Sequence, residues 1–241
     1  MQIAKTADGS LTLFNSEAGE HYHSVGEGAL RETYEKHIRP ALNLIGAAER
    51  RSVKVLDVCF GLGYNTLCTV LELTRLGFGG KCEIVAPELD RRLITSLDDF
   101  CHPEEIKEVD HIKRSLIKTL RYEDKKFNIE IVIKDAAEYV KNMKRRFDII
   151  YHDPFSIMKN PSLWSSEYFL DLFNLLEDSG VITTYSASAK ARQNMRRAGF
   201  LLYAHPFAAN SGLRSGTIAV KTTLNSDLKQ VWYKGESCLQ V

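Results

Sequence analysis

The sequence has almost no net charge, no closely paired cysteines and no long apolar run. Its 32 Lys and Arg residues nearly cancel its 31 Asp and Glu residues, so no overall field attracts nucleic acid, and a histone-like or coat-like protein is disfavoured. Any anionic partner must therefore be held by a local patch. The 5 cysteines include no C-x-x-C pair, which disfavours a disulfide framework or a zinc knuckle and fits a reducing cytoplasm.

Targeting and nucleotide-binding signals are also missing. No window approaches the ~20 apolar residues of a membrane span, and the N-terminus has no apolar signal region. We therefore expect a cytoplasmic protein that does not bind membranes. The P-loop pattern G-x-x-x-x-G-K-[ST] does not occur, which excludes a P-loop nucleotidase. No repeat or linker marks an internal domain boundary.

Short β-rich runs recur along the chain and mostly alternate with segments of helical periodicity. They lie at 53–60, 82–88, 128–135, 147–153, 180–186, 200–206 and 216–222. This alternation predicts an α/β, Rossmann-like fold with a mostly parallel seven-stranded sheet and helices on both faces. The last two runs have no room for a helix between them, so we expect a C-terminal antiparallel hairpin.

Residues 1–50 are expected to form a small extension packed on a main domain of residues 51–241. A strand is predicted at 10–14. A helix is predicted to open at Ser24, because Ser24 and Glu27 have capping-box spacing, and to break or kink at Pro40.

Four consecutive predicted strands each end in an acid, at Asp57, Glu88, Asp135 and Asp153. In a parallel sheet these carboxylates lie along one edge, where ligands bind. The turn DVCFGLGYN follows the first of these strands, and its glycines let backbone N–H groups approach a ligand. Such an edge suits ribose hydroxyls, an adenine amino group and a sulfonium or ammonium charge.

Several of these residues also have purely structural interpretations. A strand-end acid is often only the N-cap of the next helix, and this alternative stays open for Asp135 and for Asp153. Asn65 could cap the helix that follows the glycine turn or reach the ligand, and we expect the cap. His152 is not assigned as a base, because sequence alone gives no geometry for it.

The motifs D-x-C-x-G-x-G, a strand-end Glu, KDA and D-P-F resemble class I S-adenosylmethionine-dependent methyltransferases. The blocks GEHYHSVGEGALRETYEKHI, DPFSIMKNPSLWSSEYF and TYSASAKARQNMRRAGF resemble the methyltransferase domain of MnmC, over residues 8–222. The resemblance implies methyl transfer from S-adenosylmethionine to the primary amine of 5-aminomethyl(-2-thio)uridine at the tRNA wobble position. It implies tRNA, bound at its anticodon region, as the partner, with no flavin, metal or partner protein needed.

The resemblance also implies roles for individual residues. Asp153 is the catalytic candidate, because a carboxylate there orients the amine and receives or relays its proton. The residues expected to bind S-adenosylmethionine are Asp57, Gly61, Gly63, Glu88, Asp135, Tyr22 and Ser24. Cys59 and Pro154 depart from the family pattern, and we expect Cys59 to alter the first bend because it does not enter positive φ freely.

The tRNA-binding candidates are Phe155, Lys159, Trp164, Arg192, Arg196, Arg197 and Arg214. Trp164 stacks on a nucleobase or, alternatively, packs in the core. Glu27 and Glu32 match the family block, but a polar helix surface explains them equally well. A second basic cluster lies at Lys141, Lys144, Arg145 and Arg146, and a solvated surface is the alternative for both basic clusters. The segment 206–216 matches the family's basic hairpin loosely.

Two other functions stay open: a small-amine methyl or aminopropyl transferase resembling spermidine synthases, and a non-catalytic methyltransferase-like RNA-binding subunit. Because the only glycine-turn fingerprint is assigned to the methyl donor, we expect a stand-alone methyltransferase. It would accept 5-aminomethyluridine and would not process the carboxymethylaminomethyl form.

Overall fold

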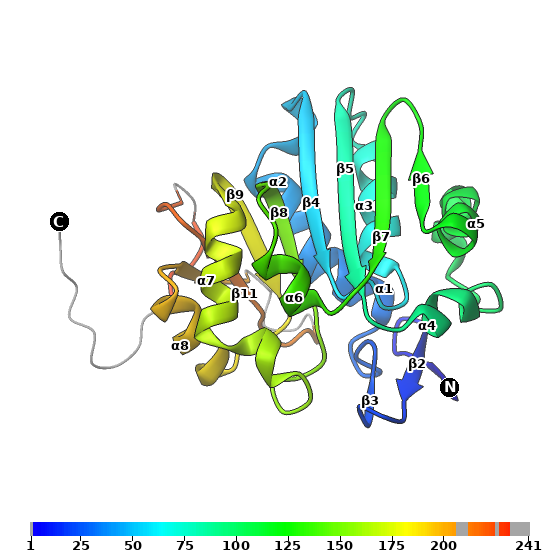
Figure 1. The fold of residues 1–241 in the computed structure, drawn as a ribbon, viewed down its shortest axis with the longest axis horizontal. Helices are drawn as coiled ribbons and strands as arrows, with labels where there is room; N and C mark the ends of the chain where they lie inside the picture. Colours follow the sequence, from blue (N-terminus) through cyan, green and yellow to red (C-terminus); the bar gives the residue numbers. More distant parts are fainter. Residues whose placement is uncertain (1, 206–211, 225–226, 232–241) are drawn as a thin grey trace.

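The structure, a computed structural model, describes residues 2–205, 212–224 and 227–231. Its main sheet has eight strands in the order β10-β11-β9-β8-β4-β5-β7-β6 (Figure 1). The strands are β4 (Ser52–Val58), β5 (Lys81–Glu88), β6 (Arg121–Glu123), β7 (Phe127–Ile133), β8 (Phe147–His152), β9 (Leu176–Thr184), β10 (Leu201–Ala204) and β11 (Thr217–Val220). Among the described helices, none is long and apolar enough to cross a membrane.

The five central strands pair in parallel, and the outer pairs are antiparallel. The predicted parallel sheet and the terminal hairpin of β10 and β11 are therefore confirmed. The strand beyond the seven expected is β6, an edge strand of three residues. A run this short gives no recognisable β pattern in the sequence.

Helices cover both faces of this sheet. The helical elements are α1 (Ala29–Glu32), η1 (Thr33–Ile38), α2 (Arg39–Leu44), η2 (Ala47–Glu49), α3 (Tyr64–Arg75), α4 (Arg91–Ser96), η3 (Glu104–Val109), α5 (Asp110–Thr119), α6 (Ala136–Lys141), η4 (Pro161–Trp164), α7 (Ser166–Leu175) and α8 (Ala189–Arg197). Helices α6, α7 and α8 lie on one face, and α2 and α3 lie on the other (Figure 1).

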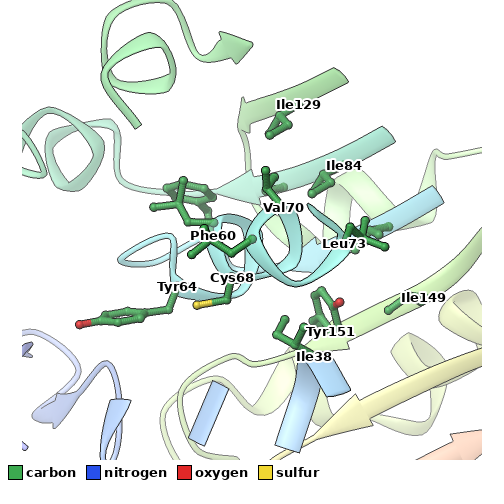
Figure 2. Close-up of a cluster of buried hydrophobic side chains, with 14 of the residues drawn as sticks. Ile38, Phe60, Tyr64, Cys68, Val70, Leu73, Ile84, Ile129, Ile149 and Tyr151 are labelled. Atoms are coloured by element: carbon green, nitrogen blue, oxygen red, sulfur yellow. The ribbon is translucent and has the colours of Figure 1, made fainter. Parts of the chain in front are cut away.

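Two hydrophobic clusters fill the space between the helices and the sheet, because successive residues of a strand point to opposite faces. On β8, Ile149 belongs to the cluster under α3, and Ile150 belongs to the cluster under α7 and α8. Figure 2 shows the first cluster, in which Ile38 of the N-terminal segment lies near Tyr151 of β8, and Val70 of α3 lies near Ile84 of β5. The first 50 residues thus contribute to the core that supports the sheet.

The chain begins with a small antiparallel sheet of β1 (Gln2–Lys5), β2 (Leu11–Asn15) and β3 (Glu20–His21). This sheet lies at the end of the main sheet where β5 and β7 finish (Figure 1). The strand predicted at 10–14 is confirmed as β2.

The first helix differs from the prediction at its start. It begins at Ala29 rather than Ser24, with Gly28 at φ 96° in the N-cap position. Ser24 Oγ instead accepts the backbone N–H of Glu27 at 3.3 Å and closes a separate turn. The side chain of Glu27 pairs with Lys36, so no capping box forms.

Pro40 does not break this helix. The segment Thr33–Ile38 widens into a π-helix, in which the N–H of Arg39 bonds to the carbonyl of Tyr34. Pro40 has no N–H, and its ring would clash with the carbonyl four residues earlier in a regular helix. The wider turn accommodates the proline and lets the helix continue to Leu44.

Candidate active site

A cavity of about 980 Å³ lies where the carboxyl ends of the central strands meet the N-terminal sheet. Three of the four strand-end acids, Glu88, Asp135 and Asp153, line it. The full set of acids in the lining is Glu17, Glu20, Glu32, Glu88, Asp90, Asp135 and Asp153. The lysine and arginine residues in the lining are Lys134, Lys159 and Arg214. A cavity with this excess of carboxylates favours a ligand rich in hydrogen-bond donors or carrying positive charge.

The glycine turn forms one wall. Gly61 and Gly63 have φ 57° and φ 80°, conformations that L side chains rarely adopt. A Cβ on Gly63 would lie 2.8 Å from the Phe60 ring. Cys59 also has a positive φ, at 67°, although it is not a glycine. This conformation costs a non-glycine residue ~1–2 kcal/mol.

Glu88 is locked to this turn. Its Oε2 accepts the N–H of Gly61 at 2.9 Å, and its Oε1 accepts the N–H of Asp90 at 2.9 Å. Burial raises the pKa of Glu88, although these backbone hydrogen bonds oppose the rise. The two backbone hydrogen bonds hold the carboxylate rigidly. Each oxygen keeps a further lone pair, so the group can still accept hydrogen bonds from two hydroxyls.

Asp135 combines the two roles that the sequence left open, the N-cap of a helix and an acceptor that faces the cavity. Its Oδ1 accepts the N–H groups of Ala137 and Glu138 at 2.9 and 3.0 Å, so it is the N-cap of α6. It also lines the cavity. Both capping bonds use the same oxygen, so the cap does not prevent Oδ2 from accepting a hydrogen bond from a ligand.

Asp57 differs from the other three acids. It is 0% exposed and is not among the cavity-lining residues, so the structure does not support the predicted contact with a cofactor. Its carboxylate accepts hydrogen bonds from Thr66 Oγ1 at 2.7 Å and Asn65 Nδ2 at 3.4 Å. Burial raises the pKa of Asp57 to about 7. Asp57 therefore anchors the start of α3 from beneath the turn.

Asn65 does not cap α3 as expected. The N-cap is Gly63, and Asn65 lies inside the first turn with its amide directed at two acids. Its Nδ2 donates to Asp153 Oδ2 at 3.0 Å and also reaches Asp57. The amide therefore links Asp57, in the core, to Asp153, in the cavity wall.

Asp153 is held from two sides. Its side chain is 12% exposed, and its Oδ1 lies 3.6 Å from Nε2 of His37. Burial alone would raise the pKa of Asp153, but His37, His23 and Asn65 outweigh this effect and lower it. The carboxylate thus stays ionised although it is mostly withdrawn from water. His152, next to it, is fully buried against Trp164 and donates toward Leu163, which gives it no access to the cavity.

Lys36 and His37, both on η1, are residues that the sequence did not single out. Lys36 is 1% exposed and lies between Glu27 at 2.7 Å and Glu32 at 3.1 Å. Glu27 and Glu32 are themselves buried, at 4% and 7% exposed, so a polar helix surface does not explain them. The Glu32–Lys36 spacing of four residues was a visible signal, whereas nothing marked His37.

The N-terminal segment covers part of the cavity. The Tyr22 ring packs against Phe155 with ring centroids 5.0 Å apart, and it lies beside Gly61. Ser24 donates its N–H to Glu32 at 3.0 Å, and both residues line the cavity. Glu20 accepts hydrogen bonds from Ser156, which ties this segment to the loop after β8.

The residues predicted to bind tRNA fall into three groups. Phe155, Lys159 and Arg214 line the cavity, and Arg214 pairs with Glu27 at 2.7 Å. Trp164 is 1% exposed and donates to the Phe155 carbonyl at 2.8 Å, so it packs in the core and its stacking on a base is not supported.

The arginines of α8 form the third group. Arg192 bonds Thr217 and the Gly216 carbonyl, and Arg196 bonds the Val231 carbonyl, so both hold neighbouring backbone, while Arg197 is exposed.

The second basic cluster lies before β8, at the edge of the sheet opposite the cavity. Arg145 pairs with Glu83 at 2.8 Å, and Arg146 lies near Glu177 and Asp178. These arginines form ion pairs on the protein surface, which favours the structural alternative for this cluster. In the loosely matching hairpin segment, positions 206–211 lie outside the described residues.

The residues present fit S-adenosylmethionine. Without a side chain at Gly61, the turn approaches the cavity closely, and Glu88 is a rigid double acceptor suited to ribose hydroxyls. Gly63 is not among the lining residues, so the structure does not support its predicted contact with the cofactor. Asp135 offers an acceptor for an amino group at the end of the next strand.

Comparison with known proteins gives a consistent result. Residues 104–221 match the model of an S-adenosyl-L-methionine-dependent methyltransferase family. The crystal structure of MNMC2 from Aquifex aeolicus is 31% identical, with a TM-score of 0.82, and the match covers 91% of this chain and 70% of that one. Spermidine synthase from Thermotoga maritima shares the fold, at 16% identity and a TM-score of 0.52 over 92% of this chain and 72% of that one.

Two curated relatives are longer than this chain. An uncharacterized protein of Methanocaldococcus jannaschii is 24% identical over 83% of this chain, which spans 54% of its length. The tRNA 5-methylaminomethyl-2-thiouridine biosynthesis bifunctional protein MnmC of Paraburkholderia xenovorans is 24% identical over 78% of this chain and 30% of its own length. With the glycine turn and the acid-lined cavity, these matches establish that the chain belongs to the S-adenosyl-L-methionine-dependent methyltransferases of the MnmC type.

Proposed function

We propose that this protein methylates the primary amine of 5-aminomethyluridine, or its 2-thio form, at the wobble position of tRNA. The product would be 5-methylaminomethyl(-2-thio)uridine. The observation that carries the proposal is the Asp153 carboxyl group, held between Asn65 and His37 in the cavity wall. The name of the MnmC relatives, which describes biosynthesis of this nucleoside, supports the choice of substrate.

The chemistry needs a carboxylate at this place. An alkylamine has a pKa of ~10 and is protonated near neutral pH, so it must lose a proton before its lone pair can attack. Asp153 would attract the ammonium group, accept a hydrogen bond from it and orient it. In each turnover one N–C bond would form while the S–CH3 bond of the donor breaks and its electron pair stays on sulfur, and the proton lost by the nitrogen would pass through Asp153 to solvent.

The remaining residues would supply binding and exclusion of water. S-adenosylmethionine, when bound, supplies a methyl group on a positively charged sulfur. Glu88 and Asp135 would bind its ribose and adenine, and the glycine turn would pass close to its methionine part. Tyr22 and Ser24 would cover it from the N-terminal side, and Asp57 would act indirectly by holding Asn65.

The RNA backbone would be held at the rim of the cavity. Lys159 is exposed, and the Arg214 side chain is 82% exposed, and both line the cavity that contains Asp153. They would bind RNA phosphates near an otherwise acidic opening. Because the net charge of the chain is only +1, RNA must be held by a few local contacts of this kind. Phe155, packed on Tyr22, offers an aromatic face to a base at the same rim.

Mass analysis of nucleosides tests the proposal. Undermodified tRNA that carries 5-aminomethyluridine would be incubated with the protein and S-adenosylmethionine, with tRNA lacking the aminomethyl group as the control. A gain of one methyl group on the modified uridine alone is expected. Methylation of free putrescine instead would favour the small-amine alternative, and absence of product from both would overturn the assignment.

A further inference from the structure

His37 contributes an imidazole to the site from a segment far away in the sequence. It is 0% exposed and lies on the π-helical segment, whereas Asp153 follows β8. A buried imidazole in a folded protein normally has partners for both nitrogens. For His37 these partners lie on two different elements of the main sheet, Asp153 after β8 and Thr183 on β9.

The hydroxyl of Thr183 faces the ring nitrogen of His37 that is turned away from Asp153. Its Oγ1 lies 3.2 Å from His37 Nδ1. A threonine hydroxyl can donate to an unprotonated ring nitrogen, and this leaves the proton of the neutral imidazole on Nε2. Within the described part of the chain, Nε2 has no normal hydrogen bond and faces Asp153 Oδ1 at 3.6 Å.

Asp153 is therefore approached by one protein donor at each oxygen. Asn65 Nδ2 lies 3.0 Å from Oδ2, and His37 Nε2 lies 3.6 Å from Oδ1. Two donors on opposite sides fix the rotation of a carboxylate and leave its remaining lone pairs in defined directions. Asn65 is fixed in turn by Asp57, and His37 by Thr183.

We propose that His37 is a positioning residue for methyl transfer, which orients the Asp153 carboxylate toward the substrate amine through its Nε2–H and is itself oriented by Thr183. This inference rests on the proposed function, because it assumes that Asp153 receives an amine. It adds a role for two buried residues that do not line the cavity.

Several titratable groups lie around His37. They are Asp153, Asp57, His23, His152, His205 and Tyr151, together with Lys36 on the same segment as His37. Of these, Asp153 lines the cavity and lies 3.6 Å from Nε2 of His37.

The sharpest test compares two neighbouring threonines. Thr183→Val removes the hydroxyl that faces His37 and nearly preserves the shape of the side chain. Thr184→Val is the matched control, because Thr184 is also 0% exposed on β9 but contacts His152 instead. We expect Thr183→Val to lower kcat about 10-fold, the effect of one lost hydrogen bond, and Thr184→Val to leave it within a few-fold.

Substitutions at His37 test the same point directly. His37→Leu should lower kcat about 100-fold with S-adenosylmethionine affinity, measured by calorimetry, nearly unchanged. The acidic limb of the kcat/KM profile should move to higher pH, because the pKa of Asp153 rises when His37 is lost. His37→Gln keeps an N–H donor and should restore most of kcat.

The outcomes separate this inference from the proposed function. If wild-type protein makes no product, the proposed function fails. If wild-type protein is active and Thr183→Val has the same kcat and pH profile as Thr184→Val, the positioning role of His37 is wrong. If His37→Leu does not fold, as judged by its thermal transition, the comparison of Thr183→Val with Thr184→Val still tests the positioning role.

Discussion

The backbone N–H of Gly61 donates a 2.9 Å hydrogen bond to Oε2 of Glu88, so the glycine turn after β4 and the acid that ends β5 form one rigid unit. Asp153, at the end of β8, is held by different partners, Asn65 and His37. This separation leads us to expect that binding of the methyl donor and handling of the amine can be changed independently.

Substitutions at the two acids test this separation. Glu88→Ala should weaken S-adenosylmethionine binding about 10-fold or more, because the variant loses the acceptor for ribose and releases the turn. Asp153→Asn should leave that affinity within a few-fold and lower turnover by ~10² or more. Calorimetry and single-turnover kinetics measure the two effects, and equal loss of cofactor affinity in both variants would contradict the separation.

A second prediction concerns the shape of the turn. Gly63→Ala should destabilise the protein by ~1–2 kcal/mol for the positive φ and by ~1–3 kcal/mol more for the contact with Phe60. Gly77→Ala is the control, because Gly77 also has positive φ, at 69°, but a Cβ there meets nothing within 4 Å. Urea unfolding of both variants separates the cost of the contact with Phe60 from the cost of positive φ. Equal losses of unfolding free energy would show that the Phe60 ring moves away freely.

The third prediction concerns how tRNA is held. The variant Lys159→Ser/Arg214→Ser should weaken tRNA binding and reduce the slope of log affinity against log salt by roughly 0.7 per lost contact. Lys141→Ser/Lys144→Ser removes the same charge from the far edge of the sheet and should leave the slope unchanged. If both double variants behave alike, the rim of the cavity is not the landing surface.

The fourth prediction is a pH dependence of stability. Burial lowers the pKa of His152 to about 4, below the ordinary 6.5, so the folded protein keeps this ring neutral. Between these values the unfolded chain binds the extra proton, and the stability present above pH 6.5 is lost as pH falls toward 4.

Unfolding free energies measured from pH 7 to 5 should therefore fall less steeply for His152→Gln than for wild type, by about 1.4 kcal/mol per pH unit at most.

Features that depend on local sequence could be predicted. The strand runs, the final hairpin and the four strand-end acids follow from periodicity and from the geometry of parallel sheets, and three of the acids do reach the cavity. The exception, Asp57, lies within β4, one residue before its end, where Thr66 and Asn65 enclose it.

Features that depend on tertiary contacts could not be predicted. Lys36 and His37 look like polar residues of a surface helix, and only the packing of η1 against α3 and β9 buries them. Asparagine is a common residue at helix N-caps, but the amide of Asn65 donates to Asp57 on β4 and to Asp153 after β8. Arg192 and Arg196 belong to a charge run, yet their guanidinium groups bond to backbone carbonyls of later segments.

The π-helical turn at Thr33–Ile38 amounts to one extra residue within a helix that runs from Ala29 to Leu44. Each residue of a regular helix rotates the next side chain by about 100°. Deleting a single residue here would restore regular spacing and swing one flank of the helix by that angle relative to the other, carrying Lys36 and His37 out of register with Glu27 and Asp153. Sequence comparisons across this segment should therefore allow a one-residue gap, since relatives that lack the extra residue would otherwise be aligned with the wrong side chains facing the methyl-transfer site.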